Sequence, residues 1–296
     1  MLIGTAEYNS TFYSQGIALK NVLINNGFSE PIEVILSENA SVQNAYNIQS
    51  KVIDFGYMAS NWIGRAKEGQ SPFTHPIDLR MVSPMNAGPS FFISLASSAI
   101  FTIADIKGKR VCVGPEKSGV INHARSILGA LKIGFDQFTP VFLDFASGAK
   151  ALARGEIDVQ LQCPIPNKVM RELDGSVDIR ILTYTSNDLE TVLRECPIYH
   201  KAFMRKGMLR SLTEDVPQPS VINVLVTNAS TDIELVRQVA LVCYRDSEEL
   251  ARLEPLYIGM KDLFVPLTTL GSAAFEFGGV KLHPGALDAY HEVGLI

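Results

Sequence analysis

Short apolar runs alternate with amphipathic segments along most of this chain, and the alternation occurs twice. The first round covers residues 2–82 and the second covers residues 91–182. An apolar run of four or five residues is typical of a buried strand, whereas apolar residues repeated every three or four positions indicate a helix. Strands that alternate with helices predict mixed, mostly parallel sheets with helices on both faces. We therefore expect an α/β protein.

Both rounds predict strands and helices of ordinary length. In the first round we expect strands at 2–5, 32–36, 52–58 and 79–82, and helices at 14–26, after 41, and at 61–66. In the second round we expect strands at 91–95, 110–113, 141–143, 157–161 and 179–182, and helices at 118–131, 147–154 and 167–173. Residues 183–219 are less regular, and a strand at 220–227 and a helix from 232 to about 253 follow them.

The order of these segments predicts two lobes. A chain that builds one α/β half, then a second, and then crosses back places its last segment in the first half. We expect the first lobe to comprise residues 1–88 and 225–296, and the second lobe to comprise residues 89–224. Ligands of such proteins bind in a cleft between the lobes, where the strands of both end.

The composition excludes several classes of protein. Of the 296 residues, 47% are apolar and 19% are charged, which is typical of a chain that folds around a core. The 26 basic and 31 acidic residues give a net charge of -5, and no basic run suggests a surface for nucleic acid. No stretch has the ~18 consecutive apolar residues of a membrane span. We expect neither a nucleic-acid partner nor membrane insertion.

The cysteines and histidines lack the spacing of a metal or redox site. Neither C-x-x-C nor H-E-x-x-H occurs among the four cysteines and five histidines. We therefore expect no metal and no cofactor, and cysteines that are mostly free and buried.

The strongest local signal lies in residues 110–119. A strand is expected to end at Gly114, and a helix to begin near Ser118 after a short loop. The first turn of a helix has unpaired N–H groups and the positive end of the helix dipole, so the N–H groups at 118–120, with Lys117 beside them, predict an anion site. An ordinary capped turn has the same pattern, and both interpretations are open. The glycine spacing matches no nucleotide-binding loop.

Two weaker signals also lie where a strand leads into a helix. Ser41 is expected to cap a helix that carries Asn44 on its first turn. Thr11 and Tyr13 stand on the first connection, where a phenol beside hydroxyls suits a polar ligand. Each pattern also has a purely structural interpretation, as a helix cap or as packing of the ring against the helix.

Together these motifs resemble the TAXI group of solute receptors for tripartite (TRAP) transporters, in the NMT/THI-like superfamily. The family's Gly-Thr-Gly…Thr-Tyr-Tyr-x-x-Gly opening resembles residues 4–16, and its Ser-x-x-Asn helix start resembles residues 41–44. Its Asp-Leu-Lys-Gly-Lys-Arg-Val…Gly-x-x-x-Ser-Gly element resembles residues 105–119. Gly-x-Ile-Asp and Leu-His-Pro-Gly-Ala…Tyr-x-Glu-x-Gly resemble residues 155–158 and 282–294. The order and spacing cover nearly the whole chain.

The resemblance implies the type II periplasmic-binding-protein fold, with two lobes that close on a small organic anion such as an amino acid or a dicarboxylate. If the protein is exported, its partners are the membrane components of a TRAP transporter. The residues that we expect to bind the ligand are Glu7, Thr11, Tyr13, Ser41, Asn44, Ser60, Lys117, Ser118, Gly119, Val120 and Gln162. The segment 283–286 is expected to be structural.

Three positions depart from the family's pattern. Glu7 replaces part of a Gly-rich stretch, Val120 replaces a threonine, and residues 160–164 replace an aromatic and Gly-rich strand end. These changes suggest an unusual ligand and leave a second hypothesis open. On that hypothesis the protein is a cytoplasmic enzyme of the same fold, such as a decarboxylase or dehydratase acting on a small carboxylic acid. Its candidate catalytic residues are Glu7, His123 and Cys163.

The expected location depends on what precedes Met1. A removed leader predicts a periplasmic receptor, whereas a genomic start at Met1 predicts a cytoplasmic protein.

Overall fold

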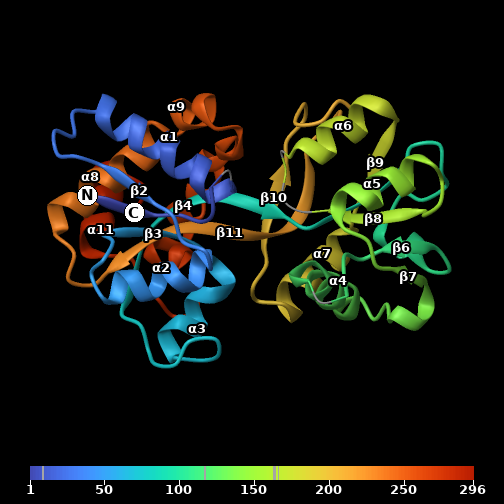
Figure 1. Ribbon diagram of the computed structural model, residues 1–296, viewed down its shortest axis with the longest axis horizontal. Coiled ribbons are helices and arrows are strands. Elements are labelled where there is room, and N and C mark those ends of the chain that lie inside the picture. The colour runs from blue at the N-terminus through green and yellow to red at the C-terminus, as the bar shows by residue number, and fades with distance from the viewer. Residues whose placement is uncertain (9, 117, 163–164, 166) are drawn as a thin grey trace. The chain divides into compact units, whose positions relative to one another are not determined.

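The computed structural model describes residues 1–8, 10–116, 118–162, 165 and 167–296. They form two compact units, one made of Met1–Ala87 and Ile222–Ile296 and the other of Gly88–Val221. Each unit has its own hydrophobic core, and the strands lie in two sheets with helices packed against them (Figure 1). The α/β class expected from the alternation is therefore confirmed.

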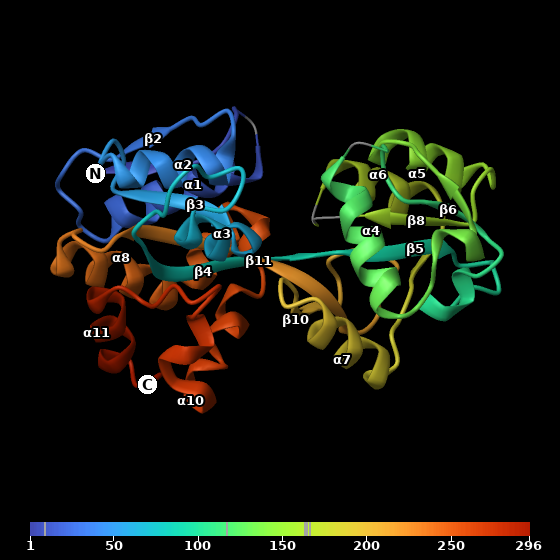
Figure 2. The same ribbon diagram turned by 90° about the horizontal axis from the view of Figure 1, so that it is seen from below.

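The first unit holds both chain ends. Its elements are β1 (Leu2–Gly4), α1 (Thr11–Asn25), β2 (Glu33–Ile35), α2 (Ala40–Gln49), β3 (Phe55–Ala59), α3 (Ile63–Glu68), most of β4 (Leu79–Pro89), the later part of β11 (Val216–Asn228), α8 (Ile233–Arg245), α9 (Ser247–Leu253), α10 (Leu267–Leu270) and α11 (Pro284–Glu292). Strand β1 lies between β2 and β3 and is parallel to both, and β11 pairs antiparallel with β3. Helices α1 and α2 cover opposite faces of these strands (Figures 1 and 2).

The second unit is built on the strand order β7-β6-β8-β5-β9. Its elements are β5 (Phe91–Leu95), β6 (Arg110–Cys112), α4 (Gly119–Ala130), β7 (Thr139–Val141), α5 (Phe145–Ala153), β8 (Val159–Gln162), α6 (Lys168–Ser176), β9 (Ile179–Ile181), α7 (Ser186–Glu195), β10 (His200–Met204) and the start of β11. Strand β6 is parallel to β7 and β8, whereas β5 is antiparallel to β8 and β9. Helices α5 and α6 lie on one side of this sheet, and α4 and α7 on the other (Figure 1).

Three local expectations were wrong. The segment 183–219, expected to be less regular, contains α7 and β10. Helix α7 begins after Thr185, whose hydroxyl caps it by accepting a hydrogen bond from the Asp188 N–H at 3.1 Å. The helix expected over 232–253 is divided at Asp246 into α8 and α9. Ser41 does not cap α2, since the helix begins at Ala40 and the Ser41 hydroxyl instead accepts the Ala59 N–H at 3.1 Å.

The motif at residues 282–286 builds the start of α11 against α8. The buried His283 side chain accepts a hydrogen bond from the Gly285 N–H at 3.1 Å, and Pro284 occupies the first helical position. A Cβ at Gly285 would lie 2.1 Å from the Ile233 carbonyl oxygen. Glycine therefore allows α11 to approach α8 closely, as both views of the pair show (Figures 1 and 2).

Candidate functional site

The side chain of Asn44 joins the chain just after β1 to the strand β3 in the first unit. Its amide group donates hydrogen bonds to the carbonyls of Thr5, at 2.7 Å, and Tyr57, at 2.9 Å. Its oxygen accepts the Ser37 hydroxyl at 2.7 Å. Asn44 is fully buried, and both of its donors are used within the protein. The structure thus gives Asn44 a positioning role at the carboxyl end of β1.

Two glycines make room for this asparagine. A Cβ at Gly4 would lie 2.5 Å from the Asn44 side-chain oxygen, and one at Gly56 would lie 3.0 Å from the Asn44 Cβ. Cβ atoms in proteins do not lie as close to a neighbouring atom as a Cβ at Gly4 would lie to the Asn44 oxygen. This packing therefore requires glycine at position 4.

A buried hydroxyl without a partner follows β3. Ser60 is 8% exposed, and its Oγ has no hydrogen-bond partner within the described part of the chain. Its neighbour Ala59 pairs with Asn223 of β11. A buried polar group left unpaired costs ~1–3 kcal/mol, so such a group calls for a water or a ligand.

Buried carboxamides form a network in the same unit, which the sequence did not reveal as a site. Gln15 of α1 and Asn223 both donate to the Asn86 side-chain oxygen, at 2.9 and 3.1 Å. The Gln15 oxygen has no partner among the residues described. The sequence feature that could have indicated this network is a polar residue among apolar ones. Gln15 lies on the buried face of α1, and Asn86 lies within the strand β4.

Three predicted ligand residues lie around the start of α1. Ser10 caps the helix by accepting the Tyr13 N–H at 3.3 Å, and Thr11 is its exposed first residue. The half-buried Tyr13 ring packs against Tyr8, with centroids 5.0 Å apart. Glu7 is exposed on the preceding loop. These side chains give this end of the first unit a polar and aromatic surface.

The loop before α4 is tighter than expected. Gly114 has a φ of +88°, and a Cβ there would lie 2.7 Å from Val120 side-chain atoms. Both the N–H and the hydroxyl of Ser118 donate to the Pro115 carbonyl, at 3.0 and 2.7 Å. The expectation that the Ser118 N–H is free for an anion was therefore wrong. Gly119 and Val120 begin α4, and Lys117 lies outside the described residues.

The end of β8 carries an unpaired carboxamide. Gln160 and Gln162 occupy alternate positions of the strand and are both fully buried. Gln160 donates to the Phe145 carbonyl at 3.0 Å. Neither the nitrogen nor the oxygen of the Gln162 side chain has a partner in the described residues. A complete amide group is thus buried without a hydrogen bond at a predicted ligand position.

Of the candidate residues of the enzyme hypothesis, His123 is hydrogen-bonded within the second unit. Burial lowers the pKa of His123, whose Nδ1 forms a 2.6 Å hydrogen bond with the Tyr199 hydroxyl. His123 belongs to the second unit and the exposed Glu7 to the first, and Cys163 lies outside the described residues. The described residues also contain no group of three or more His, Cys, Asp or Glu that could hold a metal.

The sheet topology and the two units define a class of protein, that of the type II periplasmic-binding-protein fold. The chain belongs to the NMT1-like family, whose profile matches residues 3–294. This confirms the broad part of the expected resemblance. Within the described residues, no helix is long and apolar enough to cross a membrane.

Solved structures with the same fold are distant in sequence. A TctC solute-binding protein from Polaromonas is 14% identical with a TM-score of 0.55, and the match covers 88% of this chain and 86% of that one. A periplasmic sulfonate-binding protein, SsuA, from Methylobacillus flagellatus is 13% identical with a TM-score of 0.54, over 100% and 94%. Substrate-binding domain 2 of GlnP from Lactococcus lactis is 11% identical with a TM-score of 0.53, over 86% and 93%. At these identities the likeness establishes the fold alone.

Proposed function

We propose that this protein is a solute-binding receptor for a small organic anion, such as an amino acid or a dicarboxylate. The buried Gln162 carboxamide carries the proposal, because neither its nitrogen nor its oxygen has a hydrogen-bond partner among the described residues. An amide buried without partners is costly, and a carboxylate-bearing ligand would accept from its nitrogen while a ligand N–H or O–H would donate to its oxygen. The Ser60 hydroxyl, which has no partner among the described residues, is a second buried polar group for which we propose a ligand contact.

The family and the fold support a receptor. The solved structures of this fold include proteins that are described as solute-, sulfonate- and substrate-binding. The TAXI-like motifs of the sequence favour the narrower proposal of a receptor for a TRAP transporter, with the transporter's membrane components as partners. On this proposal the protein works in the periplasm.

The single tryptophan of the chain offers a direct test. Trp62 stands two residues after Ser60 and is half-buried. A thermal-shift panel of amino acids, monocarboxylates, dicarboxylates and sulfonates should identify a stabilising acid, because a ligand at ~100 times its Kd stabilises by ~2.7 kcal/mol. The same acid should then change the Trp62 fluorescence on titration.

Matched variants assign the contacts. Gln162→Leu and Ser60→Ala should each weaken the binding of that acid about tenfold or more, which corresponds to ~1.4 kcal/mol. Gln43→Ala alters a half-buried glutamine of α2 that bonds only to Asn47 in the structure, and it should leave affinity unchanged. The proposal fails if no acid in the panel stabilises the protein, or if Gln162→Leu binds the acid as tightly as the parent.

A further inference from the structure

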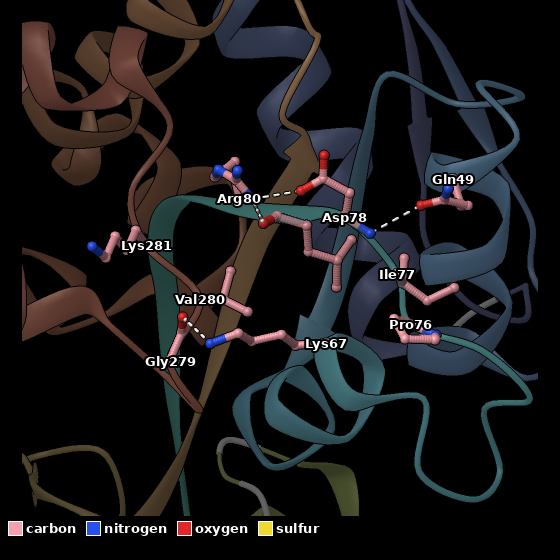
Figure 3. Close-up of a pocket in the computed structure, with 10 residues that line it drawn as sticks. Gln49, Lys67, Pro76, Ile77, Asp78, Arg80, Gly279, Val280 and Lys281 are labelled. Atoms are coloured by element: carbon pink, nitrogen blue, oxygen red, sulfur yellow. Dashed lines mark hydrogen bonds and ion pairs between the residues drawn. The ribbon is translucent and has the colours of Figure 1, made fainter.

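A separate pocket of about 430 Å³ lies within the first unit (Figure 3). Its walls come from the end of α2, from α3, from the start of β4 and from the segment before α11. The lining residues are Gln49, Lys67, residues 76–80 and residues 279–281. The volume is within the range of small-molecule sites, and none of these residues belongs to the predicted ligand set.

Hydrogen bonds join the walls of this pocket. Lys67 reaches across to donate to the Gly279 carbonyl at 2.8 Å, and Gln49 accepts the Asp78 N–H at 2.9 Å (Figure 3). Gly279 has a φ of +73°, and a Cβ there would lie 2.5 Å from the Lys67 Nζ. The Met81 N–H also donates to the Lys281 carbonyl at 2.9 Å. Segments about 200 residues apart in the chain are thus fixed side by side.

The pocket has an apolar floor and a basic rim. Ile77, Leu79 and Val280 are buried in the core of the unit, with 1–3% of their surface exposed. The rim contains the charged residues Lys67, Asp78, Arg80 and Lys281, of which Lys281 directs its side chain away from the others (Figure 3). The charge of these rim residues is +2, in a protein whose net charge is -5.

The cations of the rim are only partly neutralised. Asp78 pairs with Arg80 at 2.6 Å and offsets one of the three positive charges. Lys67 uses one N–H on the Gly279 carbonyl, which is an uncharged acceptor, so two donors of its ammonium group stay available. A pocket of this kind favours an anion with an apolar body, because the floor takes the body and the rim takes the charge.

We propose that this pocket is a second ligand site, which binds a small organic anion with an apolar body over Ile77, Leu79 and Val280 and with its charge at Lys67 and Arg80. The pocket uses residues of the first unit alone and does not involve Gln162 or Ser60. The site is therefore independent of the proposed receptor function.

The probe for this site is 4-(trifluoromethyl)benzoate, and its binding is measured by the broadening of its fluorine NMR resonance. The neutral 4-(trifluoromethyl)benzamide is the uncharged control. The benzoate should bind the parent protein, and the benzamide should bind at least tenfold more weakly. Lys67→Met should weaken benzoate binding about tenfold, and Lys67→Glu, which reverses the charge at the same position, should weaken it further. Lys20→Met, in α1 of the same unit, should leave binding within twofold of the parent.

Two further measurements separate this site from the receptor site. Gln162→Leu should bind the benzoate as the parent does, and the thermal unfolding of every variant reports whether it is folded. The inference is overturned if folded Lys67→Met and Lys67→Glu bind the benzoate like the parent, if the benzamide binds equally well, or if Gln162→Leu abolishes binding.

Discussion

The Asn44 side chain donates a 2.7 Å hydrogen bond to the carbonyl of Thr5, which lies 39 residues earlier in the chain. The same amide group bonds to the Tyr57 carbonyl, so one buried residue of α2 ties together the chain just after β1 and the strand β3. This end of the first unit also holds Ser60 and the start of α1, where the predicted ligand residues are found. Asn44 therefore fixes the position of the chain after β1 relative to β3, next to these predicted ligand residues.

Asn44→Ala should lower the free energy of unfolding by about 3–5 kcal/mol. The substitution leaves two carbonyls and the Ser37 hydroxyl buried without a partner, and each such group costs ~1–3 kcal/mol before the structure relaxes. Asn47→Ala is the matched control on the same helix, since Asn47 is half-buried and its side chain bonds only to Gln43 in the structure. Urea unfolding measures both, and a loss below 1 kcal/mol for Asn44→Ala would contradict the positioning role.

Gly285→Ala should destabilise the protein by about 1–3 kcal/mol, the usual range for overpacking. The added methyl group would lie 2.1 Å from the Ile233 carbonyl oxygen and would push α11 away from α8. Gly129→Ala is the contrasting change, because Gly129 lies inside α4 and its Cβ would meet nothing within 4 Å. That variant should gain ~0.5–1 kcal/mol through helix propensity. If thermal unfolding showed that both substitutions change the stability in the same direction, the close contact between α11 and α8 would be ruled out.

Gln162→Leu should raise the free energy of unfolding by about 1–2 kcal/mol while weakening ligand binding. Leucine removes an amide that is buried without a hydrogen-bond partner in the described part of the chain, and so removes its desolvation cost. Gln160→Leu differs in one respect, since it also takes away the donor to the Phe145 carbonyl, and it should be neutral or destabilising. If denaturant unfolding shows Gln162→Leu to be the less stable of the two, Gln162 has a structural role instead.

Acidification from pH 7.5 to 5.5 should lower stability through three histidines, of which His283 is buried and His123 and His200 are half-buried. Burial lowers the pKa of His123, His200 and His283 in the folded protein. The unfolded chain takes up protons near pH 6.5 and the folded chain only at lower pH, so stability falls as the pH drops from ~6.5 through the folded values.

The contribution of one histidine can be isolated by substitution. His123→Gln should reduce the loss of unfolding free energy between pH 7.5 and 5.5, measured by urea unfolding at both values. His75→Gln, at an exposed position, is the control. An unchanged pH dependence in His123→Gln would show that His123 takes no part in it.

Local sequence was sufficient to predict the α/β class and most of the elements. The alternation of apolar strands and amphipathic helices is a short-range pattern, and β5, β6 and α4 lie within a residue or so of their expected positions. The helix α7 was missed because its apolar residues are few, and only its cap at Thr185 marked its start. The motif spacing was sufficient to indicate the broad family.

Only the tertiary structure decided what the polar side chains do. Ser41 and Asn44 have the sequence pattern of a helix start, but their partners are Ala59 and the carbonyls of Thr5 and Tyr57. The basic pocket depends on a hydrogen bond from Lys67 to Gly279, 212 residues away. Hydrophobic periodicity follows from the local repeat of a strand or helix, whereas hydrogen-bond partners and pocket walls arise only when distant segments pack together.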